Sequence, residues 1–389
     1  MLDCNWFLNE LMRQGVSSIS GVPCSYVAGL YSLLEQGDWP YFPATSEGES
    51  VAIAAGSWLG GKQGIAFCQN SGMGNMVNPL TSLVEPFQIP VLLGVSRRGW
   101  PAEKDESQHA LMGRITPGLL EMCNLQTHTL PRDAHECSAR IEQAMHAAGD
   151  RVSTAFVIEK GSFSESAGGA AAATPALAAQ VSSDAQILEY HAGAEAVRGN
   201  VLRTCLDLEA HRPTIATTGY TGRELYALDN RPHHFYMTGS MGCAPAIGIG
   251  LVSSSGLPVT VLDGDGALLM RMGIMASVAR HVRTSFAHIL LDNGVHESTG
   301  RQLTNGAAVN FPLIAKACGY HKVWNASGVD GINQALREAM QAKDGPVFVR
   351  CKIAPHAPDK LPRPSQTLPE LALRMREANL ALISKLQHQ

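Results

Sequence analysis

The chain has 389 residues, 45% of them hydrophobic and 16% charged, which is enough for two domains that each bury a substantial core. Its net charge of −4 builds no basic face, so we expect neither nucleic acid nor an anionic membrane as a partner. No uncharged stretch is long enough to span a membrane, and nine cysteines without a Cys-x-x-Cys pair indicate reduced thiols, so we expect a cytoplasmic protein.

The first half of the sequence alternates segments of helical and strand character. Helices are expected at residues 2–13, 46–60 and 75–85, and short apolar strands at 19–23, 64–69, 90–96 and 154–159. Short apolar strands separated by helices are typical of a parallel sheet that is covered on both faces. Residues 1–163 are therefore predicted to form one α/β domain.

The composition changes at residue 164. Residues 164–186 are dominated by Ala, Ser and Gly and are predicted to be a linker, because they are too few for a middle domain. In residues 187–389, helices are expected at 194–210 and 368–386, and strands at 214–217, 259–262, 287–291 and 347–353. Because crossovers between parallel strands are right-handed, we predict two doubly wound α/β domains.

An acidic residue stands at the start of the helix expected over residues 46–60. Glu47 lies nine positions before Gly56, and most of the residues between them are small or apolar, so its carboxylate should be partly buried. Burial raises the pKa of a carboxyl group and suits it to proton transfer. The alternative is a carboxylate that only interacts favourably with the helix dipole.

A second motif lies in the C-terminal half. Asp265 stands between Gly264 and Gly266 at the end of an apolar strand, and Asn293 follows the next apolar strand, 28 positions later. The carboxyl ends of parallel strands are where such sheets bind ligands. The glycines allow close approach to a phosphate at a helix start, and the two oxygen ligands suit Mg²⁺.

With these residues the sequence resembles thiamine diphosphate-dependent enzymes, whose signature is Gly-Asp-Gly followed at this distance by Asn. The resemblance implies that Mg²⁺ is bound by Asp265, Asn293 and the carbonyl of Val295. It implies that Glu47, at a better spacing than Glu49, bonds and activates the cofactor's pyrimidine ring. The further implied cofactor contacts are Gly219, Tyr220, Gly239, Ser240, Met241, Gly264, Gly266 and Ala267.

The resemblance also implies how the cofactor is shared. Residues 1–163 would bind its pyrimidine and residues 187–389 its diphosphate and Mg²⁺. In the family these two domains come from different subunits. A homodimer or larger homo-oligomer with the cofactor at the subunit interface is therefore implied.

Several longer segments make the resemblance more specific. They are GVPCSYVAGL, SEGESVAIAAG, QNSGMGNMVNPLTSL, DESQHALMGRITP and LDNGVHESTG. Together they are similar to the phosphonopyruvate decarboxylase family over nearly the whole chain, with sulfopyruvate decarboxylase as its nearest relative. The resemblance implies non-oxidative decarboxylation of 3-phosphonopyruvate to phosphonoacetaldehyde and carbon dioxide, in the biosynthesis of phosphonates and phosphonate antibiotics.

The candidate substrate-binding residues follow from the same resemblance. His109 and His296 are candidate acid/base groups, since histidine titrates near neutral pH, and the alternative for each is a structural role. Arg98 ends a strand and is the preferred phosphonate ligand, because a guanidinium binds such a group in bidentate fashion. Further candidate contacts are Asn70, Ser71 and Arg301, the last at a position where the family is expected to have Gly.

Two alternatives stay open at this point. One is a decarboxylase or carboligase acting on sulfopyruvate or another anionic 2-keto acid. The other is a non-catalytic paralogue that only binds the cofactor. The intact Glu47, Asp265 and Asn293 argue against the second alternative.

Overall fold

The computed structural model describes residues 1–101, 105–164, 186–356, 358 and 360–387. The chain divides into two compact units, Met1–Trp58 with Lys62–Leu177 and Leu59–Gly61 with Ala178–Gln389. The linker predicted at 164–186 lies outside the described residues, except for Ser164 and Gln186. Its character therefore stays a prediction. No helix among the described residues is both long and apolar enough to cross a membrane.

The described strands of the first unit form one six-stranded parallel sheet in the order β2-β1-β3-β4-β6-β5. The strands are β1 (Val16–Gly21), β2 (Tyr41–Pro43), β3 (Gln63–Gln69), β4 (Leu92–Ser96), β5 (Gln126–Thr129) and β6 (Thr154–Ile158). The helices are α1 (Cys4–Arg13), α2 (Ala28–Gln36), α3 (Glu47–Leu59), α4 (Met73–Pro79), α5 (Glu85–Phe87), α6 (Ala110–Met122) and α7 (Ala134–Gly149).

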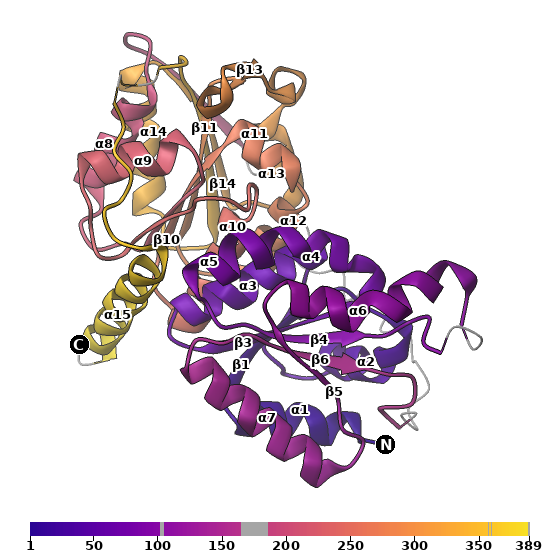
Figure 1. Ribbon diagram of the computed structural model, residues 1–389. Helices are drawn as coiled ribbons and strands as arrows, with labels where there is room; N and C mark the ends of the chain where they lie inside the picture. Colours follow the sequence, from indigo (N-terminus) through magenta and orange to yellow (C-terminus); the bar gives the residue numbers. More distant parts are fainter. Residues whose placement is uncertain (102–104, 165–185, 357, 359, 388–389) are drawn as a thin grey trace. The chain divides into compact units, whose positions relative to one another are not determined.

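Helices cover both faces of this sheet (Figure 1). Helices α1, α2 and α7 bury their apolar sides in one core with Ile65, Phe67 and Phe156. Helix α3 lies on the opposite face, and its middle residues are almost completely buried. Its small side chains bring it close to the sheet, since a Cβ atom on Gly64 would lie 2.9 Å from the Cα of Ala54. The predicted doubly wound arrangement is confirmed for this unit.

The helix predicted at 75–85 is more complex in the structure. Helix α4 begins at Met73, a π-helical turn follows at Leu80–Val84, and α5 ends at Phe87. Pro79 and Pro86 have no backbone N–H to donate within a helix, which favours a local change in the hydrogen-bond pattern. Apolar periodicity alone did not predict this irregular turn.

The second unit contains a seven-stranded parallel sheet in the order β7-β14-β15-β11-β10-β8-β9. Its strands are β7 (Ile187–His191), β8 (Thr214–Ala216), β9 (His234–Tyr236), β10 (Val259–Gly264), β11 (Phe286–Asp292), β14 (Lys322–Ser327) and β15 (Pro346–Lys352). A small antiparallel pair, β12 (Val295–His296) and β13 (Gln302–Leu303), follows β11.

The helices of the second unit also lie on both faces of its sheet (Figure 1). They are α8 (Arg198–Leu208), α9 (Tyr220–Leu228), α10 (Ala244–Ser255), α11 (Asp265–Met270), α12 (Ile274–His281), α13 (Phe311–Cys318), α14 (Val329–Gln341) and α15 (Leu368–Gln387). Helices α8, α9 and α14 share one apolar core with the strands. On the other face α10 approaches closely, since a Cβ atom on Gly248 would lie 2.7 Å from the ring of Phe286.

The two units share one strand order. Without β7, the second sheet reads β9-β8-β10-β11-β15-β14, which matches β2-β1-β3-β4-β6-β5 of the first unit position by position. In each sheet the connections reverse direction between two neighbouring strands, β1 and β3 in one and β8 and β10 in the other. Crevices outside the carboxyl ends of such strands are the usual ligand sites of open α/β sheets.

Candidate active site

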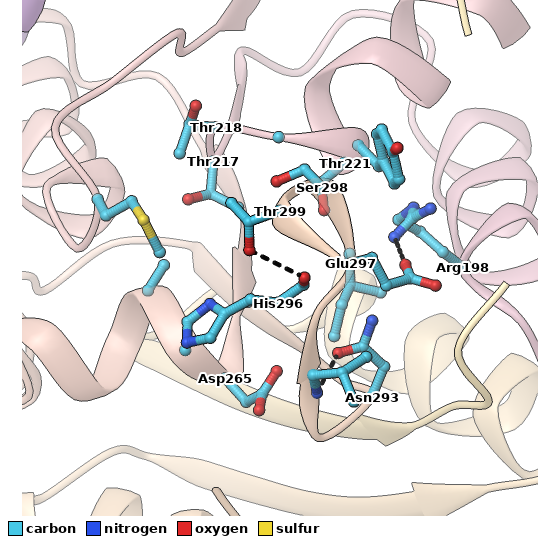
Figure 2. Close-up of a pocket in the computed structure, with 18 of the residues that line it drawn as sticks. Arg198, Thr217, Thr218, Thr221, Asp265, Asn293, His296, Glu297, Ser298 and Thr299 are labelled. Carbon is cyan, nitrogen blue, oxygen red and sulfur yellow. Dashed lines mark hydrogen bonds and ion pairs between the residues drawn. The ribbon is translucent and has the colours of Figure 1, made fainter. Parts of the chain in front are cut away.

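A pocket lies at the reversal point of the second sheet (Figure 2). Its walls come from the segments that follow β8, β10 and β11, together with Met241 and the start of α8. Among the lining residues are the following predicted cofactor and metal residues: Gly219, Tyr220, Met241, Gly264, Asp265, Gly266, Ala267, Asn293 and Val295. The structure therefore brings these residues together, whereas their roles stay predictions.

Asp265 is the first residue of α11 and is only 2% exposed. Its carboxylate accepts a hydrogen bond from the hydroxyl of Thr304. Burial raises the pKa of Asp265 above its ordinary value, and the nearby charge of Asp292 adds to this effect. A cation beside the carboxylate would oppose both causes, so the site is suited to hold one.

Asn293 follows β11, the neighbour of β10 in the sheet. Gly264 pairs with Leu291 in the register of these strands, so Asp265 and Asn293 leave the sheet side by side. The side-chain oxygen of Asn293 accepts the backbone N–H of Val295 at 3.1 Å, which fixes the turn. The structure thus bears out the expectation that both side chains stand at adjacent strand ends.

Asp292 has a charged partner of its own. Its carboxylate lies 2.6 Å from Nη2 of Arg350 and accepts from Nε at 2.7 Å. Lys352 lies 3.6 Å away on the other oxygen. These cations compensate a second buried carboxylate next to Asn293, so the site tolerates Asp292.

Two helices direct uncapped N-termini at the pocket. Gly219 precedes α9 with a φ of +90°, and Gly264 precedes α11, and neither provides a side-chain cap. The first N–H groups of a helix have no partner within it and favour an anion. The first residues of both helices line the pocket. Two such ends at one place form a suitable cradle for a diphosphate.

The segment between β9 and α10 contains an unusual backbone conformation. Ser240 has a φ of +54°, in the left-handed region that rarely suits a residue with a side chain, and Gly242 has a φ of +84°. This turn carries Met241 to the pocket wall. Gly239, Ser240 and Met241 remain predicted cofactor contacts, and of the three only Met241 lines this pocket.

The side chain of His296 packs against the turn formed by Gly264, Asp265 and Gly266, and lies beside Asp265 (Figure 2). A Cβ atom on Gly266 would collide with its imidazole ring, so only glycine at this position leaves room for the histidine. The carbonyl of His296 accepts the backbone N–H of Arg301 at 3.0 Å. Arg301 itself is exposed and has a φ of +63°. This conformation gives the physical reason for the expected glycine at that position.

Glu47 is the first residue of α3 and is half-buried in the first unit. Its Oε2 atom accepts the side-chain N–H of Asn75 at 2.7 Å. A Cβ atom on Gly72 would collide with the carboxylate, so the loop after β3 closes against Glu47. Glu47 thus follows the edge strand β2, and its carboxylate contacts the loop that follows β3.

The competitor Glu49 is placed differently. It is 2% exposed, and its carboxylate accepts the backbone N–H of Thr45 at 3.2 Å and also the Thr45 hydroxyl. Thr45 immediately precedes the helix region, so these bonds hold the start of α3. The geometry therefore favours a structural role for Glu49 and leaves Glu47 as the candidate catalytic acid.

Arg98 has an internal partner that the sequence did not reveal. Its Nε donates to Asp105 at 3.0 Å, and its Nη2 donates to the other oxygen of the same carboxylate. Asp105 also accepts from the Tyr26 hydroxyl at 2.6 Å and from the Gly99 N–H at 2.8 Å. These donors, with Arg98 first, lower the pKa of Asp105 well below its usual range. The bidentate face of Arg98 is thus engaged within the protein.

The other predicted substrate residues of the first unit lie around the same loops. Asn70 is fully buried and bonds the carbonyl of Arg98 at 2.8 Å and the hydroxyl of Thr116 at 3.1 Å, which favours a positioning role over a substrate contact. Ser71 is exposed and accepts from Gln69 at 2.5 Å. His109 is half-exposed, and its carbonyl packs against Gly99.

One pair of pocket residues was missed entirely by the sequence analysis. Arg198 and Glu297 both line the pocket and form a buried ion pair at 2.5 Å (Figure 2). They are 99 positions apart in the chain, and no motif links them. The only available signal was that Glu297 follows directly on His296. Both lie in residues 293–299, the loop after β11, which is called the metal-site loop here because it carries the predicted ligands Asn293 and Val295.

The pocket fits Mg²⁺ and a diphosphate. No three His, Cys, Asp or Glu side chains gather as a metal site in the described parts of the chain. The candidate ligands are instead a carboxylate, an amide and a backbone carbonyl, an all-oxygen set that suits Mg²⁺ when phosphate oxygens complete it. The Thr217 hydroxyl is buried at the pocket wall without a hydrogen-bond partner among the described residues, as expected of a group that awaits a ligand.

Known proteins resemble the unit that contains this pocket. Residues 217–351 match the family model described as "Thiamine pyrophosphate enzyme, C-terminal TPP binding domain". The matched region starts after β8 and includes Asp265 and Asn293. A solved Rhodococcus jostii thiamine diphosphate-dependent 4-hydroxybenzoylformate decarboxylase has a similar fold, with a TM-score of 0.69 at 12% identity over 91% of this chain and 99% of that chain.

Curated relatives are similar over nearly the full length. The chain is 40% identical to the phosphonopyruvate decarboxylase of Streptomyces viridochromogenes, over 93% of this chain and 91% of the relative. It is also 40% identical to the one from Streptomyces hygroscopicus, over 97% and 94%. The sulfopyruvate decarboxylase of Methanosarcina acetivorans is 30% identical over 85% and 86%.

Proposed function

The chain belongs to the phosphonopyruvate decarboxylase family of thiamine diphosphate enzymes, and we propose that it decarboxylates 3-phosphonopyruvate to phosphonoacetaldehyde and carbon dioxide. The observation that carries the proposal is the convergence of Asp265, Asn293 and two uncapped helix N-termini on one pocket. Sulfopyruvate or another anionic 2-keto acid is the alternative substrate, favoured by the similarity to a sulfopyruvate decarboxylase.

Thiamine diphosphate, when bound, supplies the electron sink for the bond between the keto carbon and the carboxylate. The residues of this chain would hold and position it. Mg²⁺ would be bound by Asp265, Asn293 and the carbonyl of Val295, and the diphosphate by the N-termini of α9 and α11. Met241, in the pocket wall, would support the bound cofactor. Glu47 would hold a proton at the pyrimidine ring.

The reaction replaces a carboxylate by a hydrogen on the same carbon, so a proton donor is needed next to the substrate. His296 is the better supported donor, because its ring lies against the turn that carries Asp265. His109 is the second candidate, in the loop that follows Arg98 and Asp105. An imidazole ring can donate a proton to the substrate carbon, which suits either residue to this step.

Binding of the anionic end of the substrate is proposed for arginine side chains. Arg98 would take part with the Nη1 group that Asp105 leaves available, which lies 3.4 Å from the Ser25 hydroxyl. Arg301, exposed beside the metal-site loop, is the other candidate. Ser71 is exposed and remains a candidate contact, whereas Asn70 would act by holding the Arg98 backbone.

The finer expectations are proposals as well. We propose a homodimer or larger homo-oligomer, a cytoplasmic location and a place in the biosynthesis of phosphonates, including phosphonate antibiotics. The cytoplasmic location is supported by the nine cysteines, all within the described residues, none paired in a disulfide and eight of them buried.

A panel of 2-keto acids tests the substrate. Purified protein with Mg²⁺ and thiamine diphosphate is given phosphonopyruvate, sulfopyruvate and pyruvate, and aldehyde formation is measured. We expect the highest kcat/KM for phosphonopyruvate. A higher value for sulfopyruvate would transfer the assignment to the alternative substrate, and a protein whose thermal stability does not respond to Mg²⁺ and the cofactor would point to a non-catalytic role.

A further inference from the structure

Arg198 is a buried cation at the edge of the pocket in the second unit. It is the first residue of α8 and is only 4% exposed. Its side chain nevertheless lines the pocket (Figure 2). A guanidinium in such a place requires partners for its donors, because an unpaired buried charge is strongly destabilising.

The partners of Arg198 come from three different segments. Its Nε donates to Glu224 of α9 at 2.7 Å, and its Nη1 donates to Glu297 of the metal-site loop at 2.5 Å. Its Nη2 donates to the backbone carbonyl of His356, beyond β15, at 3.1 Å. The three nitrogens of the planar guanidinium each donate to a different segment. The ammonium of a lysine has one nitrogen and cannot reach all three acceptors.

The surroundings of Arg198 are fitted to these contacts. A Cβ atom on the next residue, Gly199, would lie 2.7 Å from Oε1 of Glu224, so the absence of a side chain makes room for that carboxylate. The guanidinium also lies 5.6 Å from the ring centre of Tyr220, the first residue of α9. Arg198 therefore contacts α9 at two positions.

Glu297 depends on this contact. Its side chain is 3% exposed, and its Oε1 atom is buried without a hydrogen-bond partner in the part of the chain that the structure describes. Glu297 is two residues after Val295 and four after Asn293. The position of the loop that carries the predicted metal ligands Asn293 and Val295 is thus tied to Arg198.

We propose that Arg198 is a positioning residue that holds the metal-site loop against the N-terminus of α9 and so sets the affinity for Mg²⁺ and the diphosphate. The proposal rests on the proposed function, since it concerns the same pocket. Arg198 does not touch the substrate in this account. Its effect should appear in cofactor binding and much less in substrate use.

The test measures Mg²⁺ binding to the full-length protein by calorimetry, with thiamine diphosphate present. Arg198→Met and Glu297→Ala should each raise the Mg²⁺ dissociation constant at least tenfold. The double variant should bind Mg²⁺ no more weakly than the weaker-binding single variant, because both substitutions remove the same contact. Arg198→Lys should have an intermediate effect. At saturating Mg²⁺ and cofactor, the KM for the keto acid should change less than threefold.

Arg212→Met is the matched control. Arg212 is another buried arginine of the same unit, 3% exposed, and it bonds the Val259 carbonyl at the amino end of β10, away from the pocket. This variant should lose stability and keep its Mg²⁺ affinity. If Arg198→Met fails to fold, the comparison of Glu297→Ala with the Arg212→Met control tests the proposal alone. In Glu297→Ala the buried Arg198 still has its ion pair with Glu224.

Two results would overturn the proposal. One is unchanged Mg²⁺ affinity in Arg198→Met and Glu297→Ala, and the other is additive losses in the double variant. A wild-type protein that binds neither Mg²⁺ nor thiamine diphosphate would instead refute the proposed function itself. The two failures are therefore distinguishable in one set of titrations.

Discussion

The carboxylate of Asp265 is buried at the first residue of a helix, where its charge is favoured by the helix dipole and disfavoured by the loss of water. Desolvation is the largest cause of the raised pKa of Asp265, and the hydrogen bond from Thr304 opposes it. A buried carboxylate with a raised pKa beside a pocket is typical of a functional site.

Glu47 and Glu49 provide a matched pair of substitutions. Glu47→Gln should keep binding of the cofactor but reduce kcat at least a hundredfold, because the amide cannot hold the proton at the pyrimidine ring. Glu49→Gln should lower the melting temperature and keep kcat, because the Glu49 carboxylate holds Thr45 just before α3. Wild-type turnover of Glu47→Gln, measured with saturating cofactor, would mean that the wrong carboxylate was chosen.

The buried histidines predict a pH dependence of stability. Burial, the largest cause in both cases, lowers the pKa of His233 to about 4 and that of His234 to about 3. The unfolded chain binds protons below about pH 6.5 and the folded chain does not, so the free energy of unfolding falls as the pH drops from 6.5 toward 4. Each histidine contributes at most about 1.4 kcal/mol per pH unit.

Urea unfolding at a series of pH values measures this effect. The double variant His233→Asn/His234→Asn should show a flatter dependence between pH 6.5 and about 4 than the wild type. The same slope in both proteins would show that these two side chains are not buried in the neutral form.

At the residue scale, a short motif was enough to predict which side chains lie close together. Asp265 and Asn293 were found because each directly follows an apolar strand, and the register of β10 and β11 brings them together. The ion pairs Arg98–Asp105 and Arg198–Glu297 were not predicted, because no periodicity identifies the partner of a charged residue. Such pairs depend on how loops pack after the sheet has formed.

At the scale of elements, the buried strands were the most predictable. The continuous apolar runs of β4 and β6 are fully buried and lie within one or two residues of the expected bounds. The edge strands β5 and β7 have no fully buried residue, only exposed and half-buried ones, and they were missed. The helix expected from residue 194 begins at Arg198, because Val197 has an extended backbone with a ψ of 166°.

Two exposed glycines test what the backbone requires of an element. Gly256 ends α10 with a φ of +69°, and no atom lies within 4 Å of a Cβ placed there. Gly256→Ala should therefore cost about 1 kcal/mol through backbone strain alone. Gly118 lies inside α6, also with open space, and Gly118→Ala should stabilise by about 0.5–1 kcal/mol.

Denaturant unfolding of both variants measures the difference. The change in the free energy of unfolding should have opposite signs in the two variants. The substitution is the same, but Gly256 has a positive φ and Gly118 has not. If both alanines had the same effect, the strain at Gly256 would not explain the glycine.

At the scale of the whole molecule, the two units share a strand order that their sequences did not reveal. The sequence predicted two doubly wound domains but not their strand order, because strand order depends on long-range pairing. In this equivalence Asp265 follows β10, the counterpart of β3, whereas Glu47 follows β2, the counterpart of β9. The two predicted site residues therefore follow strands that are not counterparts of each other.

Subunit mixing tests the proposed homo-oligomer. Glu47→Gln and Asp265→Ala should each be inactive alone. If each site combines Glu47 of one subunit with Asp265 of another, unfolding and refolding the two variants together restores about one quarter of wild-type activity, since half of the dimers then contain one intact site. Mixtures that stay inactive although mixed dimers form would show that each site lies within one chain.

The central claim is that this protein replaces the carboxylate of a phosphonylated 2-keto acid by a solvent proton, with thiamine diphosphate and Mg²⁺. Its most direct test is the reaction of phosphonopyruvate in deuterated water, followed by proton and phosphorus NMR. We predict phosphonoacetaldehyde with deuterium at the aldehyde carbon, formed only when both thiamine diphosphate and Mg²⁺ are present. Unchanged phosphonopyruvate in the complete mixture, or turnover that does not require the cofactor, would contradict the account.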